Sequence, residues 1–162
     1  MTDFSLSAPT GRLLVYEQSL RWTTALRRLD PTLEPMRLRS LRSLAHRVAQ
    51  FPASLLFWEL RLAELRNLLS VIDDLKSRAP RLLPFAFCPE LPRMTPADVE
   101  ELRFALLEFG VPELLGTPRD LDSLLPIIRR RLAETLPELS LQESVQQRLP
   151  WKPGSTGQVS GN

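Results

Sequence analysis

Five short strand-like runs, four of them largely apolar and one alternating between apolar and polar residues, alternate along this chain with five stretches of helical periodicity. The runs are shorter than an ordinary buried helix, and prolines or charged residues bound them, which is typical of strands. They span residues 12–16, 36–41, 53–60, 82–87 and 111–115. The stretches that follow them carry apolar side chains three or four positions apart, as in a helix with one buried face. Strands and helices are therefore expected to alternate.

The best-marked helix begins after Thr95. Thr95 is a favourable N-cap, Pro96 suits the first helical position, and Asp98 complements the positive end of the helix dipole. Gly110 can close the helix in a left-handed conformation. The expected buried stripe of this helix consists of Val99, Leu102, Leu106 and Phe109.

Alternating strands and helices predict an α/β fold, a doubly wound, five-stranded parallel sheet of (βα)5 type. Parallel neighbours need crossover connections, which helices provide on both faces of the sheet. The functional crevice of such a sheet lies beyond the carboxyl ends of its strands. An all-helical adaptor is the alternative, because short apolar runs are ambiguous by period alone. Prolines at positions 52, 80, 84, 89 and 112 oppose it.

One domain is expected from 162 residues, of which 43% are hydrophobic and 25% charged. We place it at residues 11–137, after a polar lead-in at residues 1–10. Residues 138–162 are rich in Gln, Ser, Pro and Gly and are expected to form a disordered tail, in which Trp151 is a candidate contact motif. No stretch resembles a membrane span or a signal peptide, so a cytoplasmic location is expected.

Composition excludes several kinds of chemistry. Cys88 is the only cysteine and His46 the only histidine, so intramolecular disulfides, cysteine zinc sites and multi-histidine metal sites are excluded. Cys88 is interpreted as a small core residue and His46 as a surface side chain. The net charge is only +2, and acidic stretches separate the arginine clusters. This pattern does not indicate nucleic-acid binding.

Residues from Arg12 to about Ala133 resemble the receiver domain of bacterial response regulators, whose fold is flavodoxin-like. Two segments carry the resemblance: ASLLFWELRL is similar to the phosphoacceptor strand, and FGVPELLGTPRDLDSLLPIIRRRL to the last strand, loop and helix. In that family, two acids after the first strand and one aspartate after the third hold magnesium, and the aspartate accepts a phosphoryl group. A hydroxyl residue and a lysine, after the fourth and fifth strands, hold that group.

The resemblance implies a degenerate phosphoacceptor pocket. Glu17 and Gln18 stand at the acidic pair, so one charge is missing. Glu59 stands at the phosphoacceptor position with an extra methylene, and Thr117 replaces the lysine beside a retained Pro118. Residues 87–89 offer no hydroxyl. These departures predict a pseudo-receiver. The alternative that Glu59 is an exposed acid at the end of a strand, without a role, stays open.

The expected function is a non-enzymatic signalling or assembly module that binds a protein partner, or a second copy, without phosphorylation and without a cofactor. The resemblance places its interaction face on the last two helices and the last strand, with charged side chains at Arg103, Glu108, Arg129, Arg130 and Arg131. The alternative is an atypical receiver that is still phosphorylated on Glu59, or that binds magnesium weakly through Glu17 and Glu59.

Overall fold

A computed structural model of the protein describes residues 10–135. The strands in this range are β1 (Leu13–Tyr16), β2 (Met36–Leu38), β3 (Leu55–Glu59), β4 (Leu83–Phe87) and β5 (Leu114–Leu115). The α-helices are α1 (Arg21–Leu29), α2 (Leu41–Gln50), α3 (Leu65–Arg78), α4 (Pro96–Glu108) and α5 (Leu121–Thr135). Strands and helices thus alternate as the sequence predicts.

The five strands form one parallel sheet in the order β2-β1-β3-β4-β5. In its centre Val15 lies opposite Phe57 and Phe57 opposite Phe85. β1, β3 and β4 are buried almost throughout, as expected for strands covered on both faces. The predicted doubly wound α/β class is confirmed, and the all-helical alternative is wrong.

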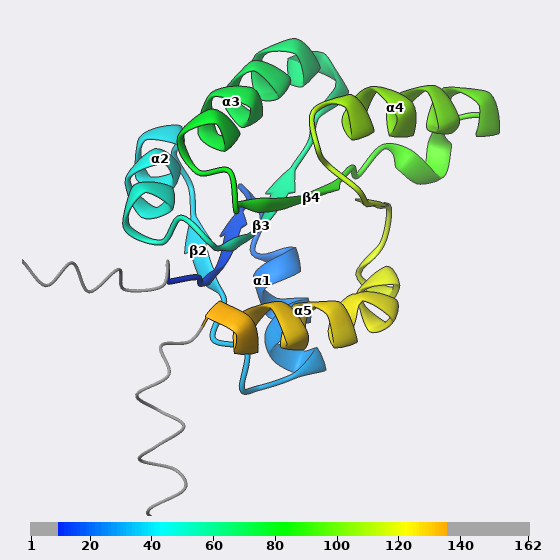
Figure 1. Ribbon diagram of the computed structural model, residues 1–162. Coiled ribbons are helices and arrows are strands. Elements are labelled where there is room, and N and C mark those ends of the chain that lie inside the picture. The colour runs from blue at the N-terminus through cyan, green and yellow to red at the C-terminus, as the bar shows by residue number, and fades with distance from the viewer. Residues whose placement is uncertain (1–9, 136–162) are drawn as a thin grey trace, which may run out of the picture.

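Two hydrophobic cores lie on opposite faces of the sheet. On one face, α2, α3 and α4 pack against side chains such as Leu14, Leu56 and Trp58. On the other face, α1 and α5 pack against side chains such as Val15, Phe57 and Phe87. Figure 1 shows these two helical layers with the sheet between them. Alternate residues of each strand feed the two cores, since successive side chains point to opposite faces.

The last strand is shorter than predicted. The Val111 amide donates to the Leu106 carbonyl (3.0 Å) and so completes the end of α4, where Gly110 has φ +72°. Pro112 has no amide hydrogen to donate. Pairing with β4 therefore begins at the Glu113 carbonyl, which accepts from the Ala86 amide (3.1 Å).

The second strand is also shorter than predicted, because the Ser40 hydroxyl oxygen accepts the Ser43 amide and starts α2. The cap of α4 is as predicted: the Thr95 hydroxyl oxygen accepts the Asp98 amide. The lead-in up to Pro9 and the tail from residue 138, with Trp151, lie outside the described residues. No helix within residues 10–135 is long and apolar enough to cross a membrane.

Candidate functional site

Glu17 follows β1 but turns toward the start of α1. Its carboxylate accepts hydrogen bonds from the amides of Trp22 (2.8 Å) and Thr23 (2.9 Å), and the side chain is completely buried. The Arg37 guanidinium lies 3.9 Å from the same carboxylate. α1 has no cap from its own N-cap residue, Leu20. Glu17 therefore supplies the capping oxygens of α1 from the preceding loop.

Glu59, the last residue of β3, connects two loops at the carboxyl edge of the sheet. One of its oxygens accepts the Gln18 amide (2.9 Å), and the other accepts from the Arg61 guanidinium (3.2 and 3.3 Å). Gln18 is held further by its side-chain amide, which donates to the Arg39 carbonyl (3.0 Å), and by Arg37, which donates to the Gln18 carbonyl (2.6 Å). Glu59 is only 7% exposed. It is therefore a buried junction residue and not an exposed strand-end acid.

A hollow of about 450 Å³ lies beyond the ends of β1, β3 and β4. Side chains of both charge signs surround it: its lining consists of Ser19, Arg21, Trp22, Glu59, Arg61, Pro89, Glu90 and Arg93. A second hollow, of about 180 Å³, is lined by Tyr16, Gln18, Glu59, Arg61 and Glu64. Glu59 and Arg61 line both hollows. The crevice expected at this edge of the sheet is thus present.

Thr117 and Pro118 line neither of these hollows. They begin the 3₁₀ turn Pro118–Asp120 ahead of α5. The Asp120 carboxylate accepts the amides of Gly116 (3.0 Å) and Thr117 (2.9 Å). The structure brings Glu59 together with the Gln18 backbone, but it places Glu17 under α1 and Thr117 at the start of this turn.

The carboxylates at this edge do not fit a magnesium ion. The donor set expected from the resemblance is Glu17 and Glu59, and all four of their oxygens already accept protein N–H groups. A hard divalent cation needs oxygen ligands that are open to it. Within residues 10–135, no cluster of three or more His, Cys, Asp or Glu side chains is placed to hold a metal.

Cys88, just after β4, is completely buried, as the sequence predicts for a core residue. Burial, together with the hydrogen bond from its thiol to Glu90 (3.2 Å), raises the pKa of the thiol to about 11. A thiol with so high a pKa is almost entirely protonated at neutral pH and is a poor nucleophile. Cys88 is therefore not the reactive centre of this site.

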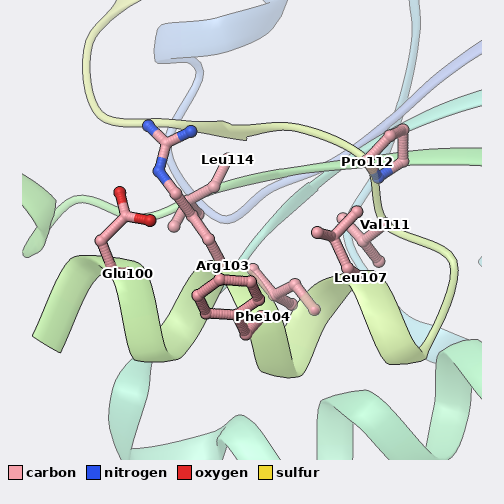
Figure 2. A pocket seen from close by; sticks show the side chains of 8 residues that line it. Glu100, Arg103, Phe104, Leu107, Val111, Pro112 and Leu114 are labelled. Atoms are coloured by element: carbon pink, nitrogen blue, oxygen red, sulfur yellow. The ribbon is translucent and has the colours of Figure 1, made fainter.

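A separate feature lies on α4. Phe104 is 66% exposed and Leu107 is 52% exposed, although the opposite side of the same helix buries Leu102 and Leu106. Figure 2 shows Phe104 and Leu107 beside a hollow between α4 and the segment that leads to β5. Its lining consists of Glu100, Arg103, Phe104, Leu106, Leu107, Val111, Pro112 and Leu114, and its volume is about 140 Å³. α4 is thus apolar on two sides.

The charged residues expected at the interaction face differ in their surroundings. Arg129 of α5 pairs with the buried Asp30 (2.7 Å), and Arg130 pairs with Glu134 (3.0 Å). Arg131 donates to the Arg81 carbonyl and lies 4.0 Å from Glu134. Arg103 and Glu108 of α4 are exposed, and neither takes part in an ion pair among the described residues.

Sequence reasoning did not identify two groups of side chains. Arg21 and Arg93 join Arg61 only because the ends of parallel strands meet at one edge, and the usable signal is that each lies in a segment following a predicted strand. Phe104 and Leu107 lie off the stripe of Leu102 and Leu106. Large apolar residues outside the buried stripe of a helix are the signal that identifies them.

The arrangement of strands, helices and crevice defines a CheY-like receiver fold. Among solved structures, this chain is similar to a CheY-like protein, tadZ, from Pseudomonas aeruginosa PAO1, with TM-score 0.57, 18% identity and coverage of 89% of this chain and 98% of that one. A response regulator from Thermotoga maritima matches with TM-score 0.54, 16% identity and coverage of 78% and 98%.

A putative pilus assembly-related protein from Burkholderia pseudomallei K96243 matches with TM-score 0.51, 18% identity and coverage of 78% and 94%. No protein-family model and no curated protein sequence matches this chain. At these identities the likeness shows the fold, which is the receiver-like fold predicted from the two sequence segments.

Proposed function

We propose that this protein is a non-catalytic pseudo-receiver that acts as an assembly module, and that it associates with a second copy of itself through α4, β5 and α5 without phosphorylation. The observation that carries the proposal is the exposed pair Phe104 and Leu107, on a helix that already buries its other side. Exposed large apolar side chains that cluster beside a hollow mark interaction surfaces. One fold neighbour is described as a putative pilus assembly-related protein, in keeping with an assembly role.

Independence from phosphorylation is supported by the hydrogen bonds of Glu59. An attacking carboxylate needs a free oxygen in line with the phosphoryl donor. Both Glu59 oxygens are bound, to the Gln18 amide and to Arg61, and the side chain is almost inaccessible. The same contacts fasten the loops after β1 and β3 to each other. In this proposal Glu59 is a permanent connection between those loops, at the position where a receiver has its switchable aspartate.

A second copy is the partner that this face fits. Interfaces with twofold symmetry need a surface that complements itself. The face presents the exposed Phe104 beside a hollow whose lining combines apolar side chains with Glu100 and Arg103, and Glu108 lies on the same helix. In an antiparallel pairing of two α4 helices, each Phe104 could fill the partner's hollow while Arg103 faces an acid. The arginines of α5 are held within their own chain, so we assign them a supporting role.

Sedimentation velocity over a wide concentration range tests the self-association. We expect the wild type to form a dimer, and Phe104→Glu/Leu107→Glu to sediment as a monomer, because each glutamate would have to be desolvated in the interface. Leu41→Glu is the matched control, since Leu41 is also exposed (41%) but starts α2. It should dimerise like the wild type. A wild type that stays monomeric at millimolar concentration would contradict the proposal, as would a heterologous partner that binds this face instead.

A further inference from the structure

The hollow of about 450 Å³ at the carboxyl edge of the sheet collects three arginines from three different connections. Arg21 is the first residue of α1, Arg61 follows β3, and Arg93 ends the 3₁₀ turn Leu91–Arg93 after β4. We propose that this hollow binds the phosphoryl group of a small phosphomonoester, held without a covalent bond. The proposal does not depend on the dimer face, which lies on α4.

The charges of the lining favour an anion. Arg61 is paired with Glu59 at 3.2 Å. Arg21 and Arg93 are different: within residues 10–135, neither has a carboxylate oxygen within 4.0 Å. Three arginines and the two glutamates, Glu59 and Glu90, leave this lining with a formal charge of 3 − 2 = +1. A guanidinium binds a phosphoryl group through two parallel hydrogen bonds, so two unpaired arginines provide the main contacts.

The same lining limits the kind of ligand. Glu59 and Glu90 would repel the outer phosphates of a polyphosphate, whereas a single phosphoryl group can lie on the arginine side of the hollow. Glu90 and the Ser19 hydroxyl can accept hydrogen bonds from hydroxyl groups on the rest of the ligand. The volume lies within the range of roughly 300–1,000 Å³ common for small-molecule sites. A small, hydroxylated phosphomonoester therefore fits the charge, the size and the polar groups.

The Trp22 and Thr23 amides at the start of α1 are not available to this ligand. Glu17 already accepts the amides of Trp22 and Thr23 from inside the fold. The arginine side chains must therefore provide the binding energy, which makes the site testable by substitution. Glu59 keeps its hydrogen bonds from the Gln18 amide and from Arg61, so no phosphoryl group is transferred to it and the mass of the protein does not change when the ligand binds.

Titration with inorganic phosphate and with glycerol 3-phosphate, followed by NMR amide shifts at constant ionic strength, tests the site. We expect saturable shifts in the loops after β1, β3 and β4. Arg21→Gln/Arg93→Gln should weaken binding by roughly a hundredfold, about tenfold for each charge-assisted contact. Arg42→Gln/Arg66→Gln removes two exposed arginines on α2 and α3 and should bind like the wild type. Arg93→Gln alone serves if the double variant does not fold.

Three results would overturn the proposal. Equal affinity of the wild type and the folded Arg93→Gln variant would show that these arginines do not hold the anion. Shifts that grow linearly with phosphate and never saturate would indicate general salt effects. Binding to phosphatidylglycerol vesicles in the absence of any response to glycerol 3-phosphate would assign the arginines to a membrane headgroup instead of a soluble ester.

Discussion

At the scale of single residues, Glu17 links the loop after β1 to the first turn of α1. Glu17→Gln leaves one acceptor oxygen for two buried amides, those of Trp22 and Thr23, and places an amide group where a carboxylate faced Arg37. An unpaired buried donor costs about 1–3 kcal/mol. We expect the free energy of unfolding in urea to fall by about that amount.

Glu64→Gln is the control for this measurement, because the Glu64 side chain is exposed and takes part in no ion pair in the described part of the chain. A loss below about 0.5 kcal/mol in Glu17→Gln, the range of ordinary surface substitutions, would contradict the capping role. The sequence identified Glu17 as a residue of interest, but as half of an acidic pair. Glu17 lies four residues before the first residue of α1, so its capping role depends on the path of the loop between them. The local sequence pattern does not specify that path.

At the scale of elements, Asp30 joins the end of α1 to α5. Its carboxylate accepts from the hydroxyl (2.6 Å) and amide (2.9 Å) of Thr32 and pairs with Arg129 at 2.7 Å. The Thr32 hydrogen bonds, followed by Arg129, lower the pKa of Asp30 from 3.8 to about 2. Asp30 and Arg129 are 99 residues apart in the sequence, so their contact holds together α1 and α5, the two helices of one layer.

This shift predicts how stability depends on pH. The folded protein binds the Asp30 proton less readily than the unfolded chain, so the stabilisation is fully present above about pH 4. It is lost as the pH falls from 3.8 through about 2. Urea unfolding of the wild type and Asp30→Asn should therefore show a wild-type advantage at pH 6 that shrinks steadily below pH 4.

Asp73→Asn, an exposed acid on α3, should show no comparable pH-dependent gap from the wild type. A wild-type advantage over Asp30→Asn that is constant between pH 6 and pH 2 would contradict the assignment of the shift to this carboxylate. The sequence predicted both helices but not their connection. Arg129 was expected to be available to a partner, because pattern alone shows a basic residue on a helix and not which acid it meets.

At the scale of the whole molecule, the sequence was informative about the fold because local and global signals agree. Apolar runs bounded by prolines, the Thr95 cap and the Gly110 stop all indicate the elements that the structure contains. The site was less predictable. Residues such as Arg21, Arg61 and Arg93 are far apart in the chain, and only the strand order brings their side chains to one hollow.

The central claim is that a receiver-like fold here associates without phosphoryl control. The most direct test is sedimentation velocity of the wild type with and without acetyl phosphate and magnesium, with intact mass measured on the same samples. We expect the same dimerisation constant in both conditions and no added phosphoryl mass, because the Glu59 carboxylate is already bound by Gln18 and Arg61. A phosphoryl adduct that disappears in Glu59→Gln, together with a dimer that forms only in its presence, would contradict the account.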